Sequence, residues 1–273
     1  MYQSYWQLHA RPFENALSDQ SYYPSELHQG ALLKLRYAVE NRREAALLVG
    51  PSGSGKTLMI DRLRNQLPDK YVPFVHLVFP QMAPHELLAY LADELTGGNS
   101  SGPAASIHET VRRIEKGLAE HVAAGRHAVV AIDEAHLLAD TDSLETIRLL
   151  LNFRVAGQSA LTVLLVGQPS LLPALDRMPD LEQRLDVKCL TRGFTLEETV
   201  SYATHRLQAA GQQRNIFEHD ALDAVYHLTD GIARRINRLC DLALLVAFAE
   251  QKSTISTAQL ESICDELVAV APE

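Results

Sequence analysis

The chain has 273 residues, of which 47% are hydrophobic and 22% charged, and its formal net charge is -9. This balance is typical of a globular protein with a sizeable buried core, and the length suits one large α/β domain plus a smaller one. The acidic total argues against binding nucleic acid by bulk charge, and no apolar run reaches the ~18 residues that cross a bilayer. Cys189, Cys240 and Cys264 show no CxxC spacing, so neither a disulfide framework nor a zinc site is predicted.

The first predicted elements lead into a glycine-rich loop. After an aromatic start over residues 1–24, apolar residues recur at helical spacing across residues 27–39 and predict an amphipathic helix. The apolar run Ala45–Val49 then ends in glycine and gives way to a helical pattern near Lys56. Residues 1–44 are therefore expected to form an N-terminal linker and helix before a strand, a loop and a second helix.

Strand signals continue to residue 190 and alternate with helical patterns. Further candidate strands cover residues 72–78, 128–132, 161–166 and 186–190. This alternation predicts an α/β domain over residues 45–191, with a parallel sheet sandwiched by helices. The segment 97–106 is rich in Gly, Ser and Pro and is expected to be a flexible surface connection.

From residue 195 onward the pattern is helical only. Candidate helices cover residues 196–210, 219–229, 233–249 and 257–267. This change predicts a second, all-helical domain over residues 192–273.

The loop after the first strand fits the phosphate-binding pattern GxxxxGK[ST]. Its residues are Gly50, Pro51, Ser52, Gly53, Ser54, Gly55, Lys56 and Thr57, and Leu58 follows them. A strand before this pattern and a helix after it are the context of a Walker A loop in a P-loop NTPase, in which backbone amides surround phosphate oxygens. Lys56 is then expected to reach the β- and γ-phosphates of ATP, and Thr57 to bind Mg²⁺.

A buried strand ending in two carboxylates predicts the Walker B element. Asp133 and Glu134 follow the apolar run Ala128–Ile132. Asp133 is expected to hold Mg²⁺ and Glu134 to polarise the attacking water. Asp133–His136 also spells the DEAH of one helicase class, but the other helicase motifs are not apparent and the chain is too short for two RecA-like domains.

Motifs along nearly the whole chain resemble those of the ExeA/GspA-type AAA+ ATPases, a family associated with bacterial general secretion and pilus assembly. They are Tyr5–Leu8, Arg11–Phe13, Asp133–His136, Glu145–Asn152, Gly167–Pro169, Gln183 with Arg184, Leu196–Thr199, His205–Leu207, Ala210 with Gly211, and Gly231–Asp241. The resemblance implies an AAA+ ATPase of ASCE type followed by a helical lid domain.

The resemblance also implies roles for three further side chains. Gln168, at the tip of a strand expected between the loop strand and the Walker B strand, would be the sensor 1 residue that contacts the γ-phosphate or water. Arg184 would be the arginine finger that reaches a neighbouring subunit's nucleotide, with Arg177 as the competing candidate. Arg234 would be the sensor 2 residue, although Ala233 replaces the proline that is usual before it.

The implied partners are a second copy of the chain, in a ring or filament, and a protein of a secretion or pilus system. The amino terminus lacks a signal peptide, so we expect a cytoplasmic protein, held at the inner face of the cell membrane through a partner or a further C-terminal segment. Members of the family often carry a membrane span and a peptidoglycan-binding domain after the ATPase, and this chain shows neither.

Two other functions stay open from the sequence. One is an ATP-dependent DNA-binding regulator of the transposition or origin-loader type, suggested by the basic residues Arg234, Arg235 and Arg238. The other is a nucleotide-gated scaffold with negligible turnover. The adenine contacts are not defined by any motif, and Phe13, Tyr22 and Tyr23 are the candidates.

Overall fold

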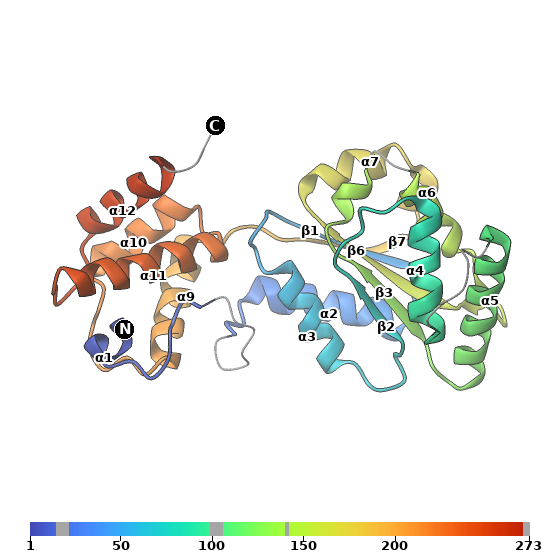
Figure 1. Cartoon of the computed structure of the whole chain (residues 1–273), viewed down its shortest axis with the longest axis horizontal. Coiled ribbons are helices and arrows are strands. Elements are labelled where there is room, and N and C mark those ends of the chain that lie inside the picture. The colour runs from blue at the N-terminus through green and yellow to red at the C-terminus, as the bar shows by residue number, and fades with distance from the viewer. Residues whose placement is uncertain (15–21, 99–105, 140–141, 270–273) are drawn as a thin grey trace. The chain divides into compact units, whose positions relative to one another are not determined.

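The computed structural model describes residues 1–14, 22–98, 106–139 and 142–269 (Figure 1). These residues form two compact units. The α/β unit comprises residues 27–50 and 56–191, and the helical unit comprises residues 1–26, 51–55 and 192–273. Residues 1–26 therefore group with the helical unit, although the sequence predicts that residues 1–44 form one leading segment. Most of the expected flexible connection, residues 99–105, lies outside the described part of the chain.

The α/β unit is built on a parallel sheet. Its described strands are β1 (Ala45–Val49), β2 (Phe74–Leu77), β3 (Ala128–Ile132), β6 (Leu161–Gly167) and β7 (Leu185–Leu190). They lie in the order β2-β3-β6-β1-β7, and every neighbouring pair is parallel. The carboxyl ends of β1, β3 and β6 consequently meet at one edge of the sheet, as expected for the loop strand, the Walker B strand and the strand between them.

Helices cover both faces of this sheet (Figure 1). They are α2 (Glu26–Glu40, of which Glu26 counts with the helical unit), α3 (Lys56–Gln66), α4 (Pro84–Thr96), α5 (Ile107–Ala123), α6 (Ser143–Leu150), α7 (Leu172–Asp176) and α8 (Pro179–Glu182). Leu47 packs in a core with residues of α4, α5 and α6, whereas the next residue, Leu48, packs in a second core with residues of α2 and α3. Side chains that alternate between two buried layers explain why the central strands read as continuous apolar runs.

A short antiparallel hairpin was not predicted. Strands β4 (Arg154–Val155) and β5 (Gln158–Ser159) pair with each other and stand apart from the main sheet. The turn between them contains Ala156 and Gly157, both with positive φ.

The helical unit packs around its own apolar core. Its described helices are α1 (Tyr2–Trp6), α9 (Leu196–Ala209), α10 (His219–Thr229), α11 (Ala233–Ala249) and α12 (Thr257–Ala269). Thr195 caps α9 in a capping box with Glu198, which fixes where the first helix of the C-terminal part begins.

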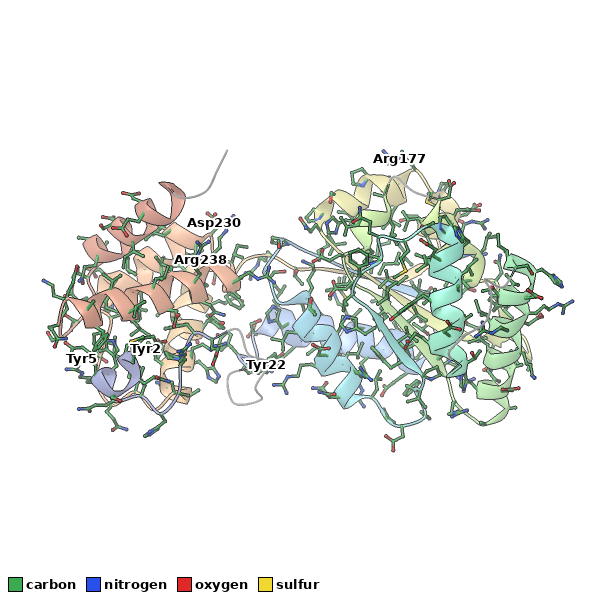
Figure 2. The ribbon with its side chains drawn as sticks, viewed as in Figure 1. Tyr2, Tyr5, Tyr22, Arg177, Asp230 and Arg238 are labelled. Carbon is green, nitrogen blue, oxygen red and sulfur yellow. The ribbon has the colours of Figure 1, made fainter. Side chains whose placement is uncertain are left out.

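The amino-terminal segment is an integral part of this helical core. The buried indole of Trp6 donates to the Leu244 carbonyl at 3.0 Å. Tyr2 and Tyr5 on α1 (Figure 2) reach Asp241 and the Lys252 carbonyl, respectively, through their hydroxyl groups. These contacts explain why residues 1–14 group with helices that lie some 200 residues later in the sequence.

Candidate active site

The phosphate loop follows β1 and ends where α3 begins at Lys56. Gly53 and Gly55 have φ values of 78° and 88°, in the left-handed region that side chains disfavour. Such turns direct successive backbone amides toward one side, which suits an anion. Lys56 is only 6% exposed, and its ammonium group donates to the Gly50 carbonyl at 3.0 Å.

The acidic pair stands at the carboxyl end of β3. The Thr57 hydroxyl donates to Oδ2 of Asp133 at 2.6 Å, and the Glu134 amide donates to Oδ1 at 2.8 Å. Burial acts to raise the pKa of Asp133, but contacts from His76, Thr57 and the Glu134 amide outweigh it, so that pKa lies below its ordinary value. The carboxyl group is therefore held as an anion beside the Thr57 hydroxyl.

Gln168 lies at the same edge of the sheet. It follows β6 directly, and its Nε2 atom is 3.0 Å from Nε2 of His136 in the 3₁₀ turn η2 (Ala135–Leu138). Glu134, the residue before that turn, has φ 50° and ψ 33°. A left-handed glutamate is uncommon, and such backbone strain is found disproportionately at functional sites.

The candidate arginine finger lies at the opposite edge. Arg184 directly precedes β7, and its guanidinium donates to Oδ1 of Asn152 at 2.7 Å and lies 3.6 Å from Oε2 of Glu44, just before β1. Since β1 and β7 are parallel, Arg184 lies at the amino edge of the sheet, away from the carboxyl ends of β1, β3 and β6. The competing Arg177 is exposed at the end of α7 (Figure 2).

The remaining candidates belong to the helical unit. The Arg234 amide donates to the Gly53 carbonyl at 3.2 Å, and its side chain is exposed. Phe13 packs edge-to-face against Phe217, and Tyr23 packs against Tyr202. The rings of Phe13 and Tyr23 are therefore engaged in the core of this unit.

Two histidines of the site were not given a functional role from the sequence. His76 on β2 has its Nε2 atom 3.7 Å from Oδ2 of Asp133 and its Nδ1 atom 3.5 Å from Oδ1 of Asp61. His136 contacts Gln168. The available signal for His76 was its position, because it is a polar residue near the carboxyl end of an otherwise apolar strand.

The residues present fit a magnesium nucleotide. Across the described ranges no group of three His, Cys, Asp or Glu side chains could hold a metal ion. Magnesium needs less from the protein, because it retains water and is usually bound through one or two protein oxygens plus phosphate oxygens. Thr57 and Asp133, both in the α/β unit, supply two adjacent oxygens, which matches this requirement.

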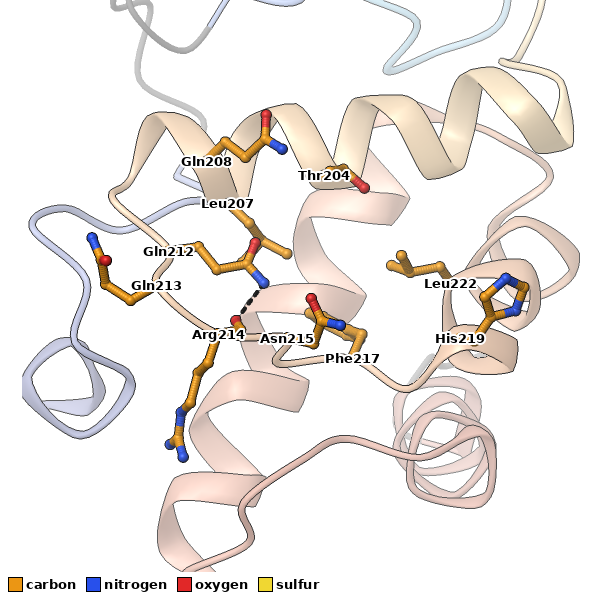
Figure 3. Close-up of a pocket in the computed structure, with 10 residues that line it drawn as sticks. All are labelled: Thr204, Leu207, Gln208, Gln212, Gln213, Arg214, Asn215, Phe217, His219 and Leu222. Atoms are coloured by element: carbon orange, nitrogen blue, oxygen red, sulfur yellow. Dashed lines mark hydrogen bonds between the residues drawn. The ribbon is translucent and has the colours of Figure 1, made fainter.

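A cavity of about 350 Å³ in the helical unit has different chemistry (Figure 3). Four of its ten lining residues carry amide side chains, and two of these bond locally. Gln212 donates to the Arg214 carbonyl at 2.6 Å, and Gln213 donates to the Gly211 carbonyl at 3.4 Å. It has no carboxylate in its lining. The residues suited to phosphate chemistry therefore lie elsewhere, at the ends of β1, β3 and β6.

These features define a P-loop NTPase. They are a parallel sheet, a glycine-rich loop after one strand, a buried lysine at the start of the next helix and an acidic pair on a second strand. The chain belongs to the family described as AAA domain, whose model matches residues 39–175, half of the chain. None of the helices in the described ranges has the length and apolar character to span a membrane.

The likeness to the ExeA/GspA type is confirmed by comparison with a curated relative. The chain is 34% identical over 253 residues to General secretion pathway protein A of Aeromonas hydrophila. This match covers 91% of the chain but 45% of the relative, so the chain spans less than half of that protein's length.

Solved structures share the fold at low sequence identity. The Aeropyrum pernix ORC2 protein, in ADPNP-ADP complexes, gives a TM-score of 0.71 at 16% identity, over 96% of this chain and 72% of that one. The Holliday junction branch migration motor RuvB of Thermotoga maritima gives 0.62 at 16% identity, over 93% and 73%. The expected fold class, an AAA+ α/β domain with a helical part, is thereby confirmed.

Proposed function

We propose that this chain binds ATP or ADP with Mg²⁺ in the loop of residues 50–57 and hydrolyses ATP to ADP and phosphate. The observation that carries the proposal is the 2.6 Å hydrogen bond from Thr57 to Asp133, next to the buried Lys56. This bond joins the two oxygen ligands expected for one ion, although they come from different motifs. The Aeropyrum pernix ORC2 protein, which shares this fold, has a solved structure of its ADPNP-ADP complexes.

The loop and the acidic pair have different roles. The backbone amides around Gly53 and Gly55 bind phosphate oxygens. Leu58 lies in the helix whose amino end faces these phosphate oxygens. Lys56 leaves the Gly50 carbonyl to neutralise the β- and γ-phosphates. Bound Mg²⁺ supplies charge neutralisation at the phosphates, and Thr57 and Asp133 hold it in place. The contacts that lower the pKa of Asp133 outweigh the effect of its burial, so the carboxylate stays anionic at neutral pH, as a ligand must be.

Glu134 acts as the residue that orients and polarises the attacking water. Its side chain is 42% exposed, so water reaches it, and its backbone is left-handed. Gln168 contacts the γ-phosphate or this water as sensor 1. Arg234, whose amide bonds to the Gly53 carbonyl in the loop, acts as sensor 2.

Arg184 acts on the nucleotide of a neighbouring copy of the chain. Its place at the amino edge of the sheet excludes action on the phosphates bound at the carboxyl edge of the same α/β unit. A guanidinium contributes most where phosphoryl charge develops, so this arginine needs a second subunit. We therefore propose a homo-oligomer, a ring or a filament, with hydrolysis at subunit interfaces.

The biological role that we propose is the assembly or remodelling of a secretion or pilus complex at the inner face of the cell membrane. It rests on the likeness to General secretion pathway protein A, a protein more than twice as long as the matched region. The protein partner would be recognised in the ATP state and released after hydrolysis.

The rival function, ATP-dependent DNA binding, has one observation in its favour: Arg234, Arg235 and Arg238 are exposed on α11. Arg235 is already paired with Asp230 at 2.9 Å, and the chain carries a net charge of -9. Fluorescence anisotropy with labelled duplex DNA, with and without Mg-ATP, separates the two functions. We expect no salt-sensitive, ATP-dependent binding, and such binding would favour the DNA regulator.

Phosphate release from Mg-ATP tests the enzymatic proposal directly. The parent protein should release phosphate in the presence of magnesium and should stop when EDTA is added. Release that continues unchanged in EDTA, or no release from an oligomeric, folded preparation, would contradict the proposal.

A further inference from the structure

A histidine lies between the two side chains to which we assign roles at the γ-phosphate. Nε2 of His136 is 3.0 Å from Nε2 of Gln168, and Nδ1 of the same ring is 3.3 Å from Oε2 of Glu134. The imidazole is only 14% exposed. The two ring nitrogens of His136 therefore connect Gln168, the sensor 1 candidate, to the carboxylate of Glu134.

The backbone around this histidine is closely packed. A Cβ atom at Gly167 would lie 3.2 Å from the His136 amide nitrogen and 3.3 Å from a methyl carbon of Leu171. The end of β6 thus lies directly against η2, and this packing fixes the distance between Gln168 and His136. Glu134 is fixed on the other side, because its amide is bonded to Asp133 and its φ is 50°.

Hydrogen-bond chemistry determines which ring nitrogen carries the proton. In the orientation that the Gln168 amide has in this structure, its nitrogen donates to Nε2 of His136, and this hydrogen bond places the ring proton on Nδ1. Nδ1 of His136 and Oε2 of Glu134 are buried atoms that have no hydrogen-bond partner among the described residues. Two such atoms 3.3 Å apart, one a donor and the other an acceptor, are matched partners, and a small rotation of the glutamate side chain aligns them.

We propose that His136 is a positioning residue for ATP hydrolysis, which holds Glu134 and Gln168 in a fixed mutual geometry. The inference rests on the proposed function. His136 itself takes no proton from water and contacts no phosphate. Its ring fixes the direction of the Glu134 carboxylate, and a change in Gln168 when the γ-phosphate is bound or lost reaches Glu134 through the same ring. Nucleotide affinity depends mainly on the loop and should not depend on His136.

The test compares turnover and affinity in variants of the full chain. His136→Ala should lower kcat by about 10- to 100-fold, the size of effect expected from a misplaced catalytic group, while KM for Mg-ATP and the affinity for ADP stay unchanged. His121→Ala is the matched control, because His121 is a partly buried histidine bonded to the Leu95 carbonyl on another helix. It should retain the parent kcat, and both variants should show similar melting temperatures.

Two amide substitutions make the test independent of how well the alanine variant folds. An asparagine nitrogen occupies nearly the position of Nδ1, whereas a glutamine nitrogen occupies nearly that of Nε2. His136→Asn should therefore keep the contact with Glu134 and recover most of the turnover, and His136→Gln should recover less. In a double-mutant cycle, His136→Ala with Glu134→Gln should be no slower than Glu134→Gln alone, because His136 acts through the Glu134 carboxylate.

The opposite results overturn the inference. They are a kcat for His136→Ala equal to that of His121→Ala, a loss that appears only in KM, equal recovery by asparagine and glutamine, or losses that multiply in the double variant. If the parent hydrolyses ATP and His136→Ala has the same kcat as the parent, only this inference is overturned. A parent that releases no phosphate from Mg-ATP removes the proposed function, and the inference falls with it.

Discussion

The hydroxyl of Thr57 donates to Oδ2 of Asp133 at 2.6 Å, although 76 positions separate the two residues in the sequence. Thr57 lies in the first turn of α3, and Asp133 lies at the end of β3. Strand β6 lies between β3 and β1, the strand that leads into the loop before α3. The parallel sheet brings the carboxyl ends of β1 and β3 to one edge, so the two motifs meet there. Both oxygens are suited to one magnesium ion.

Removing the Thr57 hydroxyl should separate nucleotide binding from magnesium binding. Thr57→Val keeps the shape of the side chain but loses the oxygen ligand, so added magnesium should no longer increase the thermal stabilisation by ATP. The measurement is the melting temperature with ATP in EDTA and in magnesium. Thr204→Val, on α9 of the helical unit, is the control and should keep the full magnesium effect; an undiminished effect in Thr57→Val would contradict the assignment.

Glu134→Gln should bind Mg-ATP and fail to turn it over. The substitution preserves size and hydrogen bonding but removes the carboxylate that polarises water, and groups of this kind contribute about 10²- to 10⁴-fold to rate. Single-turnover assays should find intact ATP on the protein after the parent has converted its own to ADP. Parent-like turnover in this variant would assign water activation to another group.

Arg184→Ala should lower kcat by up to about 10³- to 10⁵-fold if the arginine completes a neighbour's site. Mixed with the Glu134→Gln chain, it should regain part of the activity, because an interface between the two variants can contain one intact Glu134 and one intact Arg184. The readout is phosphate release as a function of the mixing ratio.

Arg154→Ala is the control for that mixing experiment. Arg154 also pairs with Glu44 but has no assigned role at a nucleotide, so its loss should leave turnover near the parent value. No recovery at any ratio of Arg184→Ala to Glu134→Gln, with both variants still assembling, would exclude action between subunits.

The buried His127 predicts a loss of stability in mild acid. Burial, with a smaller contribution from Arg42, lowers the pKa of His127 from its ordinary 6.5 to about 4, and the side chain is 1% exposed. Above pH 6.5 the ring is neutral in both the folded and the unfolded chain. Between pH 6.5 and about 4 only the unfolded chain takes up the proton, so the free energy of unfolding should fall by up to about 3 kcal/mol, at 1.36 kcal/mol per pH unit.

Urea unfolding at several pH values checks this prediction against His127→Gln. The glutamine amide has no ionisation in this range and can still bond to Thr162, which contacts Nε2 of His127 at 2.9 Å. The variant should lose less stability than the parent between pH 6.5 and 4. Equal losses in the two proteins would assign the acid sensitivity to other groups.

The parts of the fold with a strong periodic pattern could be predicted from the sequence. The strands Ala45–Val49 and Ala128–Ile132 and the helices His219–Thr229 and Ala233–Ala249 have the expected bounds, because each has a continuous apolar or amphipathic pattern with a clear end. The hairpin of β4 and β5 was missed, since strands of two residues have no measurable period. The grouping of residues 1–26 with the helical unit does not follow from the sequence pattern, because it depends on long-range contacts such as that of Trp6 with Leu244.

Only part of the candidate site could likewise be predicted from the sequence. The phosphate loop and the acidic pair follow from motifs in which each residue type has a chemical reason. His76 and His136 do not, because their significance comes from what lies next to them in space: Asp133 for one, and Glu134 with Gln168 for the other. The roles of Arg184 and Arg234 remain predictions.

Isothermal titration of the folded protein with ATP and ADP in magnesium tests the central claim most directly. The account predicts saturable uptake of both nucleotides by the parent and by Lys116→Ala, a substitution of an exposed lysine on α5, and none by Lys56→Ala, which lacks the buried ammonium group of the loop. Absence of nucleotide uptake by the folded parent, or equal uptake by Lys56→Ala, would contradict it.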